Sequence, residues 1–227
     1  MWSIAKKDLK ILFYSPIGYI VVSIFLLIFG VAIYIQAVTN HSIDFNTAYS
    51  TVAWYGMPII VAVLTMKSFS EEKSKDTENL LFVNKKNIFS VVGGKILAVF
   101  IVILISILIS LIDCFVLLQY GNINFGVLMT SIFGFLLLSL AYISFGVLIS
   151  SLTESQVISA IITLVFLFLP IFFSFGQGFF SYLSLVDFYT SFSIGVISLQ
   201  SIFVYISFTA ACVILAILEI DRKRKLN

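Results

Sequence analysis

The basic residues of this 227-residue chain fall into three short segments, which long apolar stretches separate. Lys6, Lys7 and Lys10 precede the first stretch, six lysines lie between positions 67 and 95, and a basic run covers positions 222–225. The positive-inside rule places short basic loops on the cytoplasmic side of a bilayer. The pattern therefore predicts a polytopic membrane protein with an even number of spans and both ends in the cytoplasm.

The composition excludes a water-soluble domain. Hydrophobic residues make up 61% of the chain and charged residues 11%, whereas soluble domains are about 25% charged. Lipid must therefore be the solvent for most of this surface. The one-sided basic residues predict contact with anionic headgroups rather than with nucleic acid.

A spanning helix needs about 20 mostly apolar residues, and six runs meet this requirement. They are Ile17–Val38, Ala48–Met66, Gly94–Leu118, Gly126–Ser150, Gln156–Phe175 and Ser198–Leu218. We expect an all-α integral membrane fold, in which residues 1–227 form a single domain.

Two further segments are expected at the membrane surfaces. Residues 1–16 have apolar and basic side chains at helical spacing, which predicts an interfacial helix that ends at Ser15-Pro16. Residues 176–197 are apolar enough to suggest a seventh span. That span would place the basic C-terminal run outside, so we expect a re-entrant segment in the outer leaflet instead.

The polar segment 67–93 is the longest predicted cytoplasmic loop. Asp76 or Thr77 could cap a short helix whose exposed side chains are apolar. The alternative is a solvated loop lying on headgroups. Gly93-Gly94-Lys95 lacks the rest of a P-loop, so we expect a flexible re-entry into the membrane with an interfacial lysine.

Polar residues within the spans are candidates for a transport pathway. Asp113 lies within the third span with Ser106 and Ser110 at helical spacing, while Pro58 is expected to kink the second span. The alternatives are an acid near the outer interface and hydroxyl groups that only hold helices together. The candidates are Trp54, Tyr55, Pro58, Asp113, Ser159 and Thr163.

Three stretches, in order, resemble the membrane subunits of ABC-2 type ABC exporters, most closely the small six-span permeases of the gliding-motility and nitrous-oxide-accessory kind. They are AKKDLKILFYSPIGYI near the start, FSEEKSKDTENLLFVNKKNIFSVVGGKILA in the middle and DFYTSFSIGVISLQSIFVYISFTAACVILAILEIDRKRK near the end. The chain departs from the family where Asn84 stands in place of a frequent proline, and where Lys73 and Lys75 stand in place of arginines.

The resemblance implies a permease that pairs with a second copy or a paralogue and binds two cytoplasmic ABC ATPase subunits, which hold ATP and Mg²⁺. In such exporters a coupling helix in the loop between spans two and three docks on the ATPase. The turn at residues 151–155 is a second contact. By resemblance, spans two and five line the route at the dimer interface. The coupling residues implied here are Asp76, Thr77, Glu78, Leu80, Leu81, Phe82, Lys85, Lys86 and Glu154.

No residue pattern indicates catalysis or metal binding on this chain. His41 has no ligand partner at a suitable spacing, and Cys114 and Cys212 are expected to be buried as small hydrophobic residues. We expect an ABC exporter subunit in a bacterial inner membrane. The alternatives are a secondary transporter without an ATPase, which would need more ionisable residues at mid-membrane, and a membrane protein that binds a toxin to give immunity.

Overall fold

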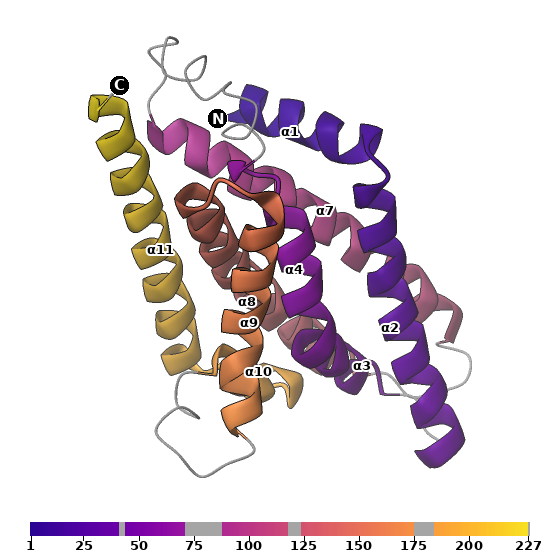
Figure 1. The fold of residues 1–227 in the computed structure, drawn as a ribbon. Coiled ribbons are helices and arrows are strands. Elements are labelled where there is room, and N and C mark those ends of the chain that lie inside the picture. The colour runs from indigo at the N-terminus through magenta and orange to yellow at the C-terminus, as the bar shows by residue number, and fades with distance from the viewer. Residues whose placement is uncertain (41–43, 71–87, 118–123, 175–183, 227) are drawn as a thin grey trace.

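The computed structural model describes residues 1–40, 44–70, 88–117, 124–174 and 184–226, which form helices and short turns without a strand (Figure 1). The helices are α1 (Trp2–Tyr14), α2 (Ile17–Asn40), α3 (Phe45–Thr51), the π-helical turn η1 (Val52–Gly56), α4 (Met57–Thr65), α7 (Ile88–Leu117), α8 (Phe125–Leu152), α9 (Gln156–Ser174), α10 (Leu185–Ser193) and α11 (Leu199–Leu226).

Five helices in the described part of the chain are long and apolar enough to cross a membrane. They cover Ile17–Thr39, Phe45–Thr65, Ile88–Phe115, Phe125–Leu152 and Leu199–Arg222. The sixth predicted span corresponds to α9, whose stretch Gln156–Pro170 is a shorter apolar helix. With 19 residues, α9 is roughly 28 Å long against a hydrocarbon core of about 30 Å. The all-α membrane class is confirmed, and the number of six spans stays a prediction.

The second span consists of α3, η1 and α4 in direct succession. Asp44 caps its start, since its carboxylate accepts hydrogen bonds from the Asn46 amide (3.2 Å) and the Thr47 hydroxyl (2.7 Å). The span therefore begins three residues before the expected Ala48. Pro58 has no amide hydrogen to donate within a helix, and the π-helical turn ends at Gly56, two residues before it. Such turns are rare in helices and occur often at functional sites.

Helix α8 lies at the centre of the bundle, where it packs against α3, α4, α7, α9, α10 and α11. Glycine permits the close approach at two places. A Cβ atom at Gly146 would lie 2.3 Å from the Thr65 Oγ1, and one at Gly134 would lie 2.4 Å from the Phe192 ring. The residues from Ala141 to Leu148 are all buried.

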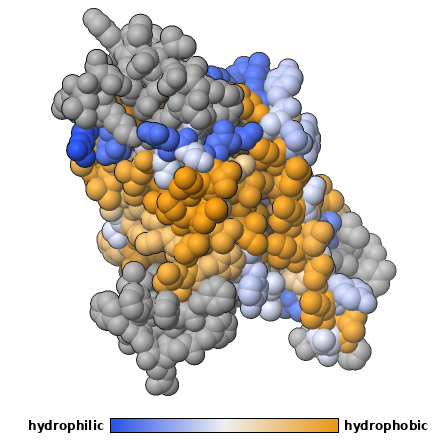
Figure 2. Space-filling view, in the orientation of Figure 1, coloured by the Kyte–Doolittle hydropathy of each residue, from blue (hydrophilic) through white to orange (hydrophobic). Residues whose placement is uncertain are grey.

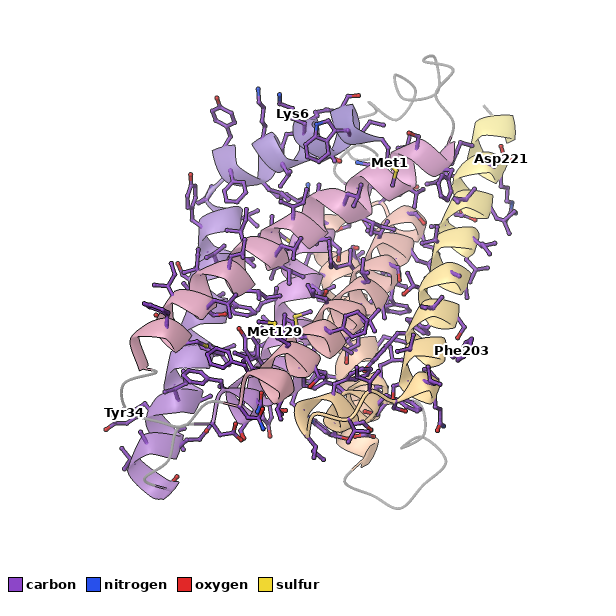
Figure 3. All side chains as sticks on the ribbon, turned by 180° about the vertical axis from the view of Figure 1, so that it is seen from behind. Met1, Lys6, Tyr34, Met129, Phe203 and Asp221 are labelled. Atoms are coloured by element: carbon purple, nitrogen blue, oxygen red, sulfur yellow. The ribbon has the colours of Figure 1, made fainter. Side chains whose placement is uncertain are left out.

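The two termini lie at the same end of the bundle (Figure 1). Figure 3 shows Met1, Lys6 and Asp221 at this end and Tyr34 near the other. On the face shown in Figure 2, a broad apolar belt lies between the ends, with hydrophilic residues above it. We call the end that carries Lys6, Lys95 and Arg222 the basic end.

The predicted re-entrant segment contains α10, a nine-residue helix that packs on α8 and α3 through Val186, Tyr189 and Phe192. Residues 176–183 of that segment lie outside the described part. Because α10 is short and ends at Ser193, the structure contains no spanning helix within the described residues of this segment. Entry of α10 into the outer leaflet stays a prediction.

Candidate functional site

The predicted coupling residues are divided between undescribed and described parts of the chain. Asp76 to Lys86 lie outside the described residues, so their contacts stay predictions. Glu154 is exposed in the turn between α8 and α9. The residues that lead into the undescribed segment, from Ser68 to Ser70, are described and have specific partners.

Ser70 and Phe69 are attached to the end of α8. The Ser150 hydroxyl accepts hydrogen bonds from the backbone amides of Phe69 (2.9 Å) and Ser70 (3.2 Å). The Ser70 hydroxyl in turn donates to the Ser150 carbonyl (3.2 Å) and lies 3.3 Å from the hydroxyl of Thr153. The two segments for which we predict ATPase contacts are therefore joined where they begin.

Lys95 lies beside this junction and is almost fully buried, with a relative exposure of 3%. Its ammonium group donates a hydrogen bond to the Ser68 carbonyl, lies 3.7 Å from the Asp8 carboxylate, and lies 4.6 Å from the centre of the Phe69 ring. A buried cation requires such partners because it loses its hydration. Three segments, α1, the end of α4 and α7, meet at this side chain.

The expectation of a flexible re-entry at Gly93-Gly94-Lys95 is wrong. Helix α7 begins at Ile88, so both glycines lie inside it. A Cβ atom at Gly94 would lie 3.0 Å from the Ile4 Cβ and the Met1 carbonyl oxygen, and one at Gly93 would lie 2.5 Å from the Met1 side chain. The glycines make room for α1, which packs along α7.

Five of the six pathway candidates occur on η1, α4 and α9, which are adjacent. Trp54 and Tyr55 lie in η1, where Trp54 is half-buried and Tyr55 is exposed, and Pro58 is buried in α4. Helix α9 packs against α4 and α8. Its Ser159 and Thr163 are fully buried, and their hydroxyl groups have no hydrogen-bond partner among the described residues. A pathway role for these residues stays a prediction.

The expected stripe of Ser106, Ser110 and Asp113 is not a single buried surface. Both serines are buried, and Ser110 lies 2.8 Å from the Tyr49 hydroxyl. Asp113 is exposed near the C-terminal end of α7, whereas the two serines on the same helix are buried. In α10, burial raises the pKa of the Asp187 carboxyl above its usual range.

A model of the family described as "ABC-2 family transporter protein" matches residues 28–218. The chain belongs to the ABC-2 transporter family. This match confirms the ABC-2 family predicted from the sequence motifs, while the resemblance to gliding-motility and nitrous-oxide-accessory permeases stays a prediction. It covers the described helices from within α2 to most of α11. No curated protein matches the chain.

As an ABC-2 permease, the chain is a membrane component of an ABC transporter and is not itself the catalytic subunit. Permeases of this family generally work with ABC ATPase partners. Sequence reasoning missed the contacts of Lys95, Asp8, Ser70 and Ser150. One signal was available, since Asp8 is the only acidic residue among the first 43 residues.

Proposed function

We propose that this ABC-2 permease is the transmembrane subunit of an ATP-driven exporter in a bacterial inner membrane. Its basic end faces the cytoplasm, where separate ATPase subunits bind ATP and Mg²⁺. The permease acts as a dimer with a second copy or a paralogue. The basic residues at this end support the orientation, because short basic loops are retained in the cytoplasm.

The attachment of Ser70 to Ser150 is the observation that carries the proposal. It places Ser70, which directly precedes the segment 71–87 in the chain, beside the turn that contains Glu154. An ATPase subunit that contacts one of these segments can therefore reach the other. Within residues 76–86 we assign Leu80, Leu81 and Phe82 as the apolar anchors, because buried apolar and aromatic side chains carry most of the energy of an interface.

Coupling requires two states of the membrane helices that the nucleotide-bound ATPases stabilise to different extents. A displacement of the docked segment reaches α8 through the hydrogen bonds between Ser70 and Ser150. Since α8 packs against six other helices, its movement changes the arrangement of the bundle. ATP binding would in this way open a route to the outside.

The dimer is supported by one face of α9, where apolar side chains are exposed at helical spacing. They are Val157, Ile158, Ile161, Ile162, Val165, Phe166 and Leu169. The buried face of the same helix carries Ser159 and Thr163 and packs within the subunit. We propose that the exposed face contacts the second permease, and that the transport route lies near α4 and α9.

Co-purification with the ATPase encoded beside this chain tests the proposal. We expect the wild-type permease to retain the ATPase and the double variant Leu80→Asp, Phe82→Asp to lose it while remaining folded. The matched control is Asn84→Asp, Asn87→Asp, which adds the same charge to the same segment and should retain the ATPase. A wild type that binds no ATPase would favour a stand-alone transporter or an immunity protein. Equal binding of the ATPase by the Leu80→Asp, Phe82→Asp variant would exclude docking through these side chains.

A further inference from the structure

Lys95 differs from the lysines of α1 because it is enclosed by protein. Lys6 and Lys10 are exposed on the surface of α1, whereas Lys95 is 3% exposed. A lysine that only marks the membrane boundary would extend its ammonium group toward water and headgroups. The ammonium group of Lys95 instead points into the junction of α1, α4 and α7, where Asp8 and the Ser68 carbonyl receive it.

Helix α1 reaches Lys95 because it lies directly on α7. Ile4 and Ala5 are buried against the bundle, and Gly94 leaves room for Ile4. Asp8 follows Ile4 by four residues, which places both on one face of α1. The Asp8 side chain is 16% exposed and lies 3.7 Å from the Lys95 ammonium group. The contact between α1 and α7 thus combines apolar packing with an ion pair.

On its other side, Lys95 contacts the residues that lead into the segment 71–87. The Ser68 carbonyl accepts its hydrogen bond, and the Phe69 ring lies under its charge at 4.6 Å from the ring centre. Such a cation–π contact is favourable where water is excluded. Any displacement of residues 68–70 therefore moves the partners of Lys95.

We propose that Lys95 is a positioning residue that transmits the movement of the ATPase-docking segment to α1 through Asp8. Helix α1 then moves with the end of α4 when nucleotide binds, and α8 moves with it through Ser150. The inference rests on the proposed function, since it requires an ATPase that docks on residues 71–87. It adds α1, which connects directly to α2 through Ser15-Pro16, to the helices that respond to ATP.

The test measures distances between spin labels in the complex of the permease with its ATPase, in lipid nanodiscs, with and without ATP and vanadate. Cys114 and Cys212 are first replaced by alanine. One label pair joins Ser3→Cys on α1 to Ser207→Cys on α11, both of which are exposed. The second pair joins Lys67→Cys, beside the docking segment, to Ser207→Cys.

In the permease with native Lys95 we expect both distances to change when nucleotide is trapped. In Lys95→Met the distance between the labels at positions 67 and 207 should still change, while the change in the distance between positions 3 and 207 should be lost. ATP hydrolysis that depends on the permease should fall roughly fivefold or more. Asp8→Asn leaves the contacts of Lys95 with Ser68 and Phe69. It should also abolish the change in the distance between positions 3 and 207. Lys95→Arg, which keeps the charge, should restore part of the change. Lys6→Met is the matched control on the exposed face of α1 and should behave as the parent.

A full change at Ser3 in both Lys95→Met and Asp8→Asn would overturn the relay while leaving the proposed function intact. If Lys95→Met does not assemble, Asp8→Asn alone decides the question. Failure of the parent permease to bind any ATPase would overturn the proposed function and the relay together. A complex in which Lys67 moves on nucleotide binding and Ser3 does not, even with native Lys95, would overturn the relay alone.

Discussion

Ser70 and Ser150 are 80 residues apart in the chain and are joined by two hydrogen bonds that Ser70 donates, each 3.2 Å long. The Ser70 amide donates to the Ser150 hydroxyl, and the Ser70 hydroxyl donates to the Ser150 carbonyl. Both residues are fully buried. Their backbone groups lie beyond the regular hydrogen bonds of α4 and at the end of α8, where helices leave polar groups without partners. The Ser70 hydroxyl therefore supplies a donor to a carbonyl at the end of α8, and the Ser150 hydroxyl supplies an acceptor to an amide beyond α4.

Replacing Ser150 with alanine should destabilise the permease. The change leaves the amides of Phe69 and Ser70 without their acceptor, and a buried unpaired donor costs about 1–3 kcal/mol. Thermal unfolding of the purified permease measures the loss. The control is Ser207→Ala, since Ser207 is exposed and bonds only within α11 in the described contacts. Equal melting temperatures for the two variants would contradict the role of Ser150.

Replacing Gly146 with valine should separate α4 from α8. The new Cβ would lie 2.3 Å from the Thr65 Oγ1, and overpacking of this kind costs about 1–3 kcal/mol. Gly30→Ala is the control, because a Cβ at Gly30 meets nothing within 4 Å. Thr65→Ala should recover part of the stability lost in Gly146→Val. No recovery, or an equal loss in Gly30→Ala, would show that this contact is not the cause.

Two tyrosine hydroxyls should stabilise the core of the bundle. The Tyr49 hydroxyl lies 2.8 Å from the Ser110 hydroxyl, and that of Tyr189 lies 2.7 Å from the Ser131 hydroxyl. Hydrogen bonds between membrane helices contribute about 0.6 kcal/mol on average. We expect each Tyr→Phe change to lower the free energy of unfolding by about this amount, measured by denaturation in mixed micelles. Tyr34→Phe, at an exposed position, should have no effect.

The exposed face of α9 should form cross-links between permease copies. With Cys114 and Cys212 replaced by alanine, Ile161→Cys should give a disulfide-linked dimer in oxidised membranes. Leu108→Cys on α7 is the control, since Leu108 is similarly exposed at 61% against 56% for Ile161. A cross-link to a different chain of similar size would identify a paralogue as the partner. Dimers formed through Leu108 and not through Ile161 would place the interface on α7.

The orientation in the membrane can be measured with single cysteines and a reagent that does not cross membranes. In the same cysteine-free background, Asn124→Cys should be labelled in intact cells, whereas Ser3→Cys should be labelled only after the membrane is opened. Both positions are exposed, and only the second lies at the basic end. The expected difference follows from the retention of short basic loops in the cytoplasm. The reverse labelling pattern would exclude the proposed topology.

Much of the architecture was predictable because lipid imposes strong rules on a sequence. A helix that crosses a bilayer satisfies its own backbone, so runs such as 17–38 and 126–150 correspond closely to α2 and α8. The family was predictable from three ordered motifs, and the match over residues 28–218 confirms it. The burial of Cys114 and Cys212 is also as expected.

The candidate site was only partly predictable. The coupling helix was predicted by resemblance, and its residues 76–86 lie outside the described part of the chain. The contacts that attach it were not recognised, because Ser70 and Ser150 are ordinary residues at the ends of apolar runs. Gly93 and Gly94 suggested flexibility, since glycine lacks a side chain that restricts the backbone. In the folded protein the same lack of a side chain allows α1 to pack on α7.

The sequence by itself determined that lipid surrounds most of the protein, and it determined the helical class, the family and the basic end. Those properties depend on the local run of apolar and charged residues, which each segment carries independently of the others. Only the tertiary structure decided that Lys95 is enclosed by Asp8, Ser68 and Phe69, and that Ser70 meets Ser150. These contacts join α1, α4, α7 and α8 across long stretches of chain, and the packing of the helices, which no single segment specifies, brings them together.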